Sequence, residues 1–379
     1  MKPKNYISVP REPGENAMNK DRIGKLIRPE IAALTAYHVP PARGLIKLDA
    51  MENPYRWPPE MVDAWLATLR HAEINRYPDP AAGTLKDKLR AAMDVPAGME
   101  ILLGNGSDEI IQILAMALAR PGARILAPEP SFVMYKMVAT FCGMEYSGVP
   151  LAEDFSLDLP AALTAIERLQ PALVFLAYPN HPTGNLFPRE DVEAVIRAAP
   201  GLVVVDEAYA PFAGGESCMA DLTRFDNLLV MRTVSKMGLA GLRLGLLAGR
   251  AEWLGEVDKL RLPYNINVLT QATAEFALEY REMFDEQAAA ICAERGRLFA
   301  ALNAMKGIEP FPSSANFVLF RTPVGRAGEL HTAIREAGVL VKNMGANEGP
   351  LADCLRVTVS LPEENVAFLE ALRQALRGV

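Results

Sequence analysis

The sequence predicts an α/β protein in which a large domain, built on a mostly parallel sheet flanked by helices, is joined to a smaller α+β domain formed from both chain ends. Short β-branched apolar runs alternate with longer Leu/Ala-rich segments, as expected when helices connect parallel strands. The runs at 172–180, 201–209 and 227–235 each end in polar residues. After about residue 265 the alternation stops, and a long helical pattern precedes two strand-like runs.

The order of these patterns along the chain predicts the domain boundaries. Residues 1–20 carry charge and proline without an apolar stretch, and we expect a flexible N-terminal segment there. We expect residues 21–48 to form the N-terminal part of the small domain, 49–265 the large domain and 266–379 the C-terminal part of the small domain. A chain of 379 residues is long enough for two such domains.

Individual elements follow from local signals. The segment "SDEIIQILAMALARPG" at 107–122 predicts a helix with Ser107 as its N-cap, acidic residues in the first turn and a Pro-Gly stop. In the C-terminal part, a helical pattern covers 268–305. The strand-like runs "SANFVLF" and "CLRVTVS" follow, separated by the helical "AGELHTAIREAG". The segment just before "KLDAMENPY" is expected to complete this smaller unit.

Composition excludes several classes of protein. Half of the residues are hydrophobic, 22% are charged, and the formal net charge is −7, which is typical of a globular protein and gives no basic surface for nucleic acid. No apolar run approaches the ~20 residues of a membrane helix, and no signal-peptide pattern opens the chain. We therefore expect a cytoplasmic protein without a nucleic-acid or membrane partner.

Neither the cysteines nor the histidines suggest a metal site. The four cysteines are far apart and form no CxxC pair, which argues against a zinc ribbon or a disulfide scaffold. The four histidines are equally scattered, and we interpret them as surface or loop residues. They are His38, His71, His181 and His331.

Polar side chains gather where the predicted strands end. Asp206 closes "VVVD", Tyr209 follows it, Asn180 closes "AYPN", and Lys236 follows "MRTVS". Each alone has a simple structural explanation, such as a helix cap, a turn or a surface lysine. Because ligands of open α/β sheets bind beyond the carboxyl ends of the strands, a carboxylate, a phenol, an amide and an amine at that edge point to a shared ligand.

Pyridoxal 5'-phosphate (PLP) matches this set of groups. It needs an amine to hold its aldehyde as a Schiff base, a carboxylate to keep the ring nitrogen protonated, and hydrogen bonds to the ring oxygen. Lys236, Asp206, Tyr209 and Asn180 can fill these roles. An aromatic ring can stack on the cofactor, and of the two aromatic residues in "PEPSFVMY" we expect Phe132 to do so.

The phosphate of such a cofactor also has candidate ligands. In "LGNGSDEII" a predicted helix opens at Gly106, Ser107 and Asp108, and a helix N-terminus offers backbone N–H groups to an anion. For Asp108 we assign the backbone amide, because its carboxylate would repel a phosphate. Arg243 in "GLRLG" can supply positive charge, and Ser235 a hydroxyl group.

At this point the chain resembles the fold-type-I PLP-dependent aminotransferases and, among them, the histidinol-phosphate aminotransferases. The resemblance spans roughly residues 22–375 and rests on an ordered series of motifs rather than on one. The series is "KLDAMENPY", "INRYPDP", "LGNGSDEIIQ", "YPNHPTG", "VVVDEAY", "RTVSKMGLAGLRLG", "LPYNINVLTQ", "ANFVLF" and "CLRVTVS".

The resemblance implies specific roles for residues beyond those above. Lys236 would shuttle the proton between substrate Cα and the cofactor. Tyr55 resembles a tyrosine that reaches the phosphate of the neighbouring subunit, which implies a homodimer with shared active sites. Arg356 resembles the arginine that binds a substrate carboxylate or phosphate, and Tyr37 resembles another substrate contact. Lys342 stands where family members commonly have arginine; it keeps the charge but loses the planar fork.

The same resemblance implies an activity. It is the transfer of the amino group of L-histidinol phosphate to 2-oxoglutarate, which gives imidazole-acetol phosphate and L-glutamate by a ping-pong mechanism in histidine biosynthesis. Asn180 would also lie on the substrate side. Alternatives of the same fold are an aromatic-amino-acid transaminase, which weak phosphate recognition by Lys342 would favour, and a threonine-phosphate decarboxylase. A nicotinamide-dependent dehydrogenase fits less well because "GNGSDE" is not a GxGxxG motif, and a noncatalytic binding module comes last.

Overall fold

The computed structural model describes residues 22–36, 40–345 and 349–377. The described residues before Ala42 belong to a compact unit of their own, which includes helix α2 (Pro29–Ala32). The second unit begins at Ala42 and contains every element discussed below. Residues 1–20 and Tyr37 lie outside the described residues, and the domain boundaries expected at residues 20, 48 and 265 stay predictions.

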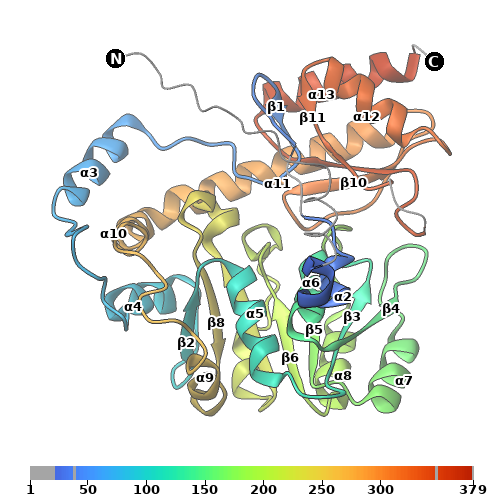
Figure 1. The fold of residues 1–379 in the computed structure, drawn as a ribbon. Helices are drawn as coiled ribbons and strands as arrows, with labels where there is room; N and C mark the ends of the chain where they lie inside the picture. The colour runs from blue at the N-terminus through green and yellow to red at the C-terminus, as the bar shows by residue number, and fades with distance from the viewer. Residues whose placement is uncertain (1–21, 37–39, 346–348, 378–379) are drawn as a thin grey trace. The chain divides into compact units, whose positions relative to one another are not determined.

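A seven-stranded sheet forms the centre of the second unit (Figure 1). Its order is β2-β8-β7-β6-β5-β3-β4, and every neighbouring pair is parallel except the two that involve β8. The strands are β2 (Glu100–Gly104), β3 (Arg124–Glu129), β4 (Glu145–Pro150), β5 (Leu173–Ala177), β6 (Leu202–Asp206), β7 (Leu228–Thr233) and β8 (Gly245–Gly249). The prediction of an α/β fold with a mostly parallel sheet is confirmed.

Both faces of this sheet are covered by helices, because alternate strand residues point to opposite sides. In β6, Val203 and Val205 belong to one core cluster, while Leu202 and Val204 belong to another. The first cluster includes buried residues of α4 (Gly83–Ala92), α7 (Leu159–Leu169), α8 (Arg189–Ala198) and α10 (Val268–Ala277). The second includes those of α5 (Ser107–Leu118), α6 (Val133–Cys142) and α9 (Ala251–Asp258). Helix α3 (Pro59–Leu69) packs beside α10.

A third core cluster lies beneath a smaller antiparallel sheet with the order β12-β13-β10-β9. Its strands are β9 (Glu309–Pro310), β10 (Phe317–Arg321), β12 (Lys342–Asn343) and β13 (Cys354–Thr358). Strand β1 (Ile46–Lys47) pairs with β11 (Val339–Leu340), so the segment near residue 47 does join this part of the chain. Helices α11 (Arg281–Asn303), α12 (Ala327–Glu336) and α13 (Pro362–Arg377) pack around it (Figure 1).

Two local predictions are corrected. Gly106, not Ser107, is the N-cap of α5, and Ser107 is its first helical residue. This helix ends at Leu118, shortly before the predicted Pro-Gly stop. The helical pattern of 268–305 is interrupted by the 3₁₀ turn Leu278–Tyr280, which separates α10 from α11. Within the described part of the chain, no helix is long and apolar enough to cross a membrane, and no cluster of His, Cys, Asp or Glu side chains suits a metal ion.

Candidate active site

A cavity lies beyond the carboxyl ends of β5, β6 and β7, where the sequence predicted a ligand. Eight predicted site residues line it, together with six residues for which no role was predicted. The predicted ones are Ser107, Asp108, Phe132, Asp206, Tyr209, Ser235, Lys236 and Arg243. The others are Met51, Ala177, Pro179, His181, Ala208 and Thr233. Residues from six segments that are distant in sequence therefore surround one space.

Lys236 occupies a short 3₁₀ turn, Val234–Met237, directly after β7. The turn is fixed by the side chain of Thr233, which accepts a hydrogen bond from the Ser235 N–H group. The amine of Lys236 donates to the carbonyl of Ala50 at 3.3 Å. Loss of hydration in the cavity, and then the charge of Arg356, lower the pKa of Lys236 to about 8. The amine is therefore neutral, and nucleophilic, in a substantial fraction of molecules near neutral pH.

Asp206 is the last residue of β6 and is 5% exposed. Its carboxylate accepts hydrogen bonds from the Tyr135 hydroxyl at 2.7 Å and from the Ala208 N–H group at 3.1 Å. Burial raises the pKa of Asp206 to about 6, in spite of these two hydrogen bonds. No cation among the described residues forms an ion pair with it. A protonated ring nitrogen would supply the missing positive charge.

Tyr135 does not line the cavity, although it was the second aromatic candidate for stacking. It is fully buried, its ring stacks on Phe175 with centroids 4.3 Å apart, and burial and Asp206 raise the pKa of its hydroxyl. The hydroxyl therefore serves as a donor that holds the Asp206 carboxylate in place. Phe132 lines the cavity, and its ring meets that of Tyr135 edge-on at 5.6 Å. Its stacking on a cofactor stays a prediction.

The first turn of α5 and Arg243 also line the cavity. Gly106 has φ of 84°, and a Cβ atom there would lie 2.7 Å from Nη2 of Arg243. The backbone of Arg243 is also in the left-handed region, with φ of 49°. Its Nη2 donates to a carboxylate oxygen of Asp108 at 3.1 Å, so the carboxylate is paired rather than turned away. Helix N–H groups, a cation and the nearby Ser235 hydroxyl suit a phosphate.

Asn180 is completely buried and is absent from the cavity lining. Its amide nitrogen donates to the Pro130 carbonyl at 3.0 Å and to the Thr183 hydroxyl at 2.7 Å. Both amide hydrogens are thus engaged within the protein. Its predicted contact with the ring oxygen stays a prediction, and it requires that one of these bonds be exchanged. Tyr209 does line the cavity, with its ring centroid 5.7 Å from the Lys236 amine.

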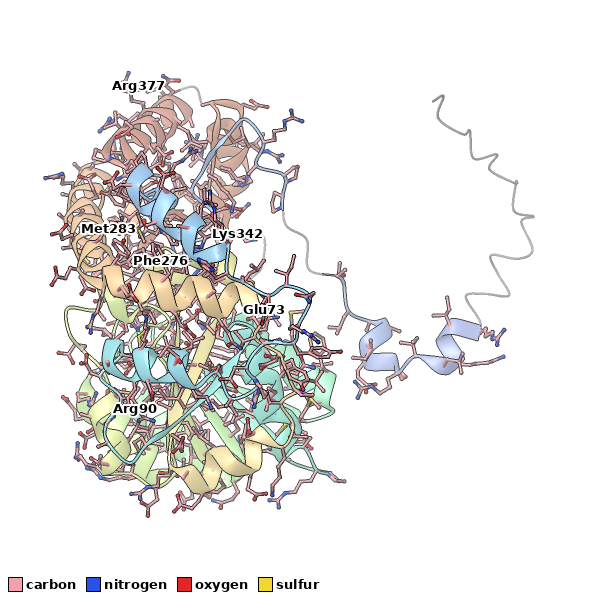
Figure 2. The ribbon with its side chains drawn as sticks, turned by 90° about the vertical axis from the view of Figure 1, so that its left-hand side faces the viewer. Glu73, Arg90, Phe276, Met283, Lys342 and Arg377 are labelled. Carbon is pink, nitrogen blue, oxygen red and sulfur yellow. The ribbon has the colours of Figure 1, made fainter. Side chains whose placement is uncertain are left out.

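Arg356 and Lys342 face each other in neighbouring strands, β13 and β12 (Lys342 is labelled in Figure 2). Arg356 is 4% exposed and donates to the carbonyl of Asp49 at 2.9 Å. Its guanidinium carbon lies 5.3 Å from the centroid of the Phe317 ring. Arg356 also donates to Nε2 of His181, which lines the cavity. This contact connects the small sheet to the cavity.

His181 is the site residue that the sequence interpretation missed. It is not a surface or loop bystander, because it lines the cavity and its imidazole touches the aromatic rings around it. The signal was present in "YPNHPTG", since the residue directly follows Asn180 in the connection after β5. The strand-end argument that selected Asn180 applies equally to its neighbour.

Of the tyrosines expected to contact substrate or a partner, only Tyr55 lies among the described residues. It is half-buried and packs against the core cluster of the small sheet. Tyr77 behaves differently: it is 79% exposed, and its ring stacks on that of Tyr264 with centroids 4.4 Å apart.

Comparison with known proteins agrees with this geometry. The family model "Aminotransferase class I and II" matches residues 43–372. A histidinol-phosphate aminotransferase of Nitrosococcus oceani is 57% identical over 94% of this chain and 99% of its own length. One of Cupriavidus pinatubonensis is 56% identical, with coverage of 94% and 98%.

Solved structures show the same fold. The histidinol-phosphate aminotransferase of Sinorhizobium meliloti, solved in complex with pyridoxal-5'-phosphate, has a TM-score of 0.82 at 25% identity, and the match covers 93% of this chain and 98% of that one. The match extends over nearly the whole of both chains, so it includes the cavity as well as the sheet. The chain therefore belongs to the aminotransferase class I and II family and, within it, to the histidinol-phosphate aminotransferases.

Proposed function

We propose that this chain transfers the amino group of L-histidinol phosphate to 2-oxoglutarate, giving imidazole-acetol phosphate and L-glutamate in histidine biosynthesis, with PLP as its cofactor. One observation carries the proposal. A single cavity is lined by the Lys236 amine, by the Asp206 carboxylate, which has no ion-pair partner among the described residues, and by the N-terminus of α5 with Arg243. The chain is 57% identical to a histidinol-phosphate aminotransferase.

The residues present fit the cofactor. PLP supplies an aldehyde that bonds covalently to an amine and a protonated ring that withdraws electrons from the substrate. Lys236 is the amine, with its pKa lowered to about 8. Asp206 would keep the ring nitrogen protonated, since its buried carboxylate forms no ion pair with a cation of the described residues. The N–H groups at Gly106 to Asp108, with Ser235 and Arg243, hold the phosphate.

Lys236 is also the base in the proposed mechanism. Once the substrate amine has displaced it, the neutral Lys236 amine would take the proton from substrate Cα and deliver it to the former aldehyde carbon of the cofactor, on the other side of the substrate nitrogen. Tyr209 lies near this amine, with its ring centroid 5.7 Å from Nζ, and its hydroxyl group would donate a hydrogen bond to the ring oxygen of the cofactor. Phe132 and Asn180 keep the roles predicted from the sequence. The cofactor would carry the amino group between the two half-reactions. The first product would leave before the second substrate binds, which predicts ping-pong kinetics.

Arg356 binds the anionic group of each substrate in this proposal. It lies at the cavity through its contact with His181, and Lys342 stands beside it across the strand pair. A second positive charge beside Arg356 favours binding of a phosphate more than a neutral side chain at position 342 would. Lys342 nevertheless binds as a point charge, without the bidentate fork of arginine, so the proposal assigns the larger share of phosphate affinity to Arg356.

A homodimer in the cytoplasm is the proposed assembly, with a tyrosine of each subunit completing the phosphate site of the other. The sequence predicts Tyr55 for this role. Tyr55 is half-buried against the core cluster of the small sheet, whereas Tyr77 is 79% exposed. An exposed tyrosine is better able to reach a partner, so Tyr77 is the second candidate. Separate Y55F and Y77F variants decide between them, because the correct one weakens PLP binding and the other leaves it unchanged.

The amino-donor panel tests the substrate. Holoenzyme is mixed with one donor at a time, and the absorbance of the cofactor reports the first half-reaction. We expect a fast response to histidinol phosphate, and a much slower one to phenylalanine and to threonine phosphate. A fast response to phenylalanine with none to histidinol phosphate would identify an aromatic-amino-acid transaminase. Release of CO₂ from threonine phosphate would identify a decarboxylase.

The covalent role of Lys236 is tested separately. Borohydride reduction of the holoenzyme fixes the cofactor to its lysine, and peptide mapping then locates the label. Label on another lysine, or on none, refutes the cofactor assignment whatever the substrate.

A further inference from the structure

Asn53 lies in the connection between β1 and α3, and its side-chain amide is fully hydrogen-bonded. The amide nitrogen donates to the carbonyl of Met237 and to Oε1 of Gln287 in α11, both at 3.0 Å. The amide oxygen accepts from the N–H group of Tyr55 at 2.9 Å. A main-chain carbonyl can only accept and a main-chain N–H group can only donate, so these contacts determine which way the amide points.

The contact with Met237 connects Asn53 to the turn that carries Lys236. Met237 is the last residue of this 3₁₀ turn. The last carbonyls of a helical turn have no partner within the turn, and Asn53 supplies one for Met237. The next residue, Gly238, has φ of 122°, and a Cβ atom there would lie 3.1 Å from the amide nitrogen of Asn53. Glycine therefore permits both the backbone conformation and the close approach.

The segment around Asn53 also contacts the other end of the lysine. The carbonyl of Ala50 accepts from the Lys236 amine at 3.3 Å. This segment is itself held by the small sheet. The N–H group of Met51 donates to the Thr358 hydroxyl at 3.0 Å, and its carbonyl accepts from the side-chain amide of Asn316 at 3.0 Å. One anchored segment thus contacts both the main-chain turn of the lysine and its amine.

We propose that Asn53 is a positioning residue for Lys236: by holding the carbonyl of Met237, it keeps the lysine turn in place against the segment whose Ala50 carbonyl receives the amine. The inference rests on the proposed covalent role of Lys236. A lysine side chain is a flexible four-carbon stem, so its amine is placed accurately only if the main chain beneath it is fixed. Asn53 is not among the residues that line the cavity, so it acts through the turn and not on the cofactor.

Two forms of the cofactor separate placement of the lysine from folding of the site. PLP has the aldehyde that bonds to the amine, whereas pyridoxamine phosphate has the same ring and phosphate but no aldehyde. Wild-type and N53A apoprotein are titrated with each compound by calorimetry. We expect N53A to weaken PLP binding by about tenfold, the effect of losing a hydrogen bond, and to change pyridoxamine phosphate binding by no more than about twofold. Equal weakening of both compounds, or an unchanged PLP affinity, overturns the proposal.

Further variants test the route through the amide. N53D keeps the shape of the side chain but places an acceptor against the Met237 carbonyl, so it should weaken PLP binding at least as much as N53A, and it decides the question if N53A folds poorly. Q287L removes one acceptor of the amide and should have a smaller effect. In an N53A background it should add nothing, because both residues act through the same amide; full additivity contradicts the inference.

N227A is the matched control. The side chain of Asn227 also donates to main-chain carbonyls, but at the amino end of β7, far along the strand from the lysine turn. The variant should lower the melting temperature of the apoprotein without changing the ratio of the two affinities. A changed ratio in N227A overturns the inference as well, since any loss of stability would then produce the same result.

Borohydride mapping of the wild type distinguishes failure of the proposed function from failure of this inference. Label that is absent from Lys236 refutes the cofactor assignment, and the positioning role with it. Label on Lys236, together with equal losses for PLP and pyridoxamine phosphate in N53A, refutes the positioning role alone.

Discussion

The lowered pKa of Lys236 makes a quantitative prediction about how the apoprotein takes up PLP. The attacking species is the neutral amine. With a pKa of about 8 instead of the ordinary 10.5, about a tenth of the molecules carry it at pH 7, roughly 300 times more than for an ordinary lysine. The rate of covalent attachment should therefore rise steeply from pH 6 to pH 8 and level off above about pH 9.

The assay is stopped-flow mixing of apoprotein with PLP between pH 6 and pH 10, followed by the absorbance of the cofactor. The reaction of a simple amine with PLP in the same buffers corrects for ionisation of the cofactor itself. R356Q is the informative variant, because the charge of Arg356 is the largest electrostatic contribution that lowers the pKa of Lys236. Its midpoint should move to higher pH. A wild-type rate that climbs in parallel with the simple amine up to pH 10 refutes the reasoning, as does an unchanged midpoint in R356Q.

Three further predictions concern the cofactor site. D206N should reduce kcat by at least about 100-fold, since a buried amide cannot balance a charged ring nitrogen; steady-state kinetics at saturating PLP measure this loss. Y135F removes a hydrogen bond that favours the charged Asp206 carboxylate, so the acid limb of the pH profile of PLP affinity should move to higher pH, and an unmoved limb contradicts the assignment. G245A places a Cβ atom 2.8 Å from the backbone of Gly106 and Ser107; unfolding curves of the apoprotein should show a loss of about 1–3 kcal/mol, and PLP titration a weaker affinity.

The residues at the strand ends could be predicted from the sequence because two rules suffice to place them. β-branched apolar runs identify buried parallel strands. The carboxyl ends of parallel strands lie at one edge of the sheet, so the residues that follow the strands lie there too. Asp206 ends β6, and Lys236 comes three residues after β7, so both reach the cavity whatever the details of the connections. The direction of β8 was beyond these rules, since a short apolar run reads the same in either direction.

Contacts between distant elements could not be predicted in this way. Tyr135 reaches Asp206 from α6, across 71 residues of sequence, and only the packing of that helix on the sheet brings them together. The place of His181 after β5 could be predicted from the strand-end rule, but its contact with Arg356 could not, because Arg356 comes from another sheet. The commitment of both Asn180 amide hydrogens to Pro130 and Thr183 likewise appears only in three dimensions.

The two arginines of the site are held in contrasting ways, and the contrast matches what each is proposed to bind. Arg243 is half-exposed and paired with the Asp108 carboxylate, so its charge is largely balanced, and the N–H groups of α5 must contribute much of the attraction for a phosphate that stays in place. Arg356 is buried, and its contacts with His181 and Asp49 are to neutral acceptors. Low hydration strengthens its attraction for an anion. A ping-pong enzyme must bind and release two different anionic substrates at one position, so the arginine proposed for the substrates is separate from the one proposed for the cofactor phosphate.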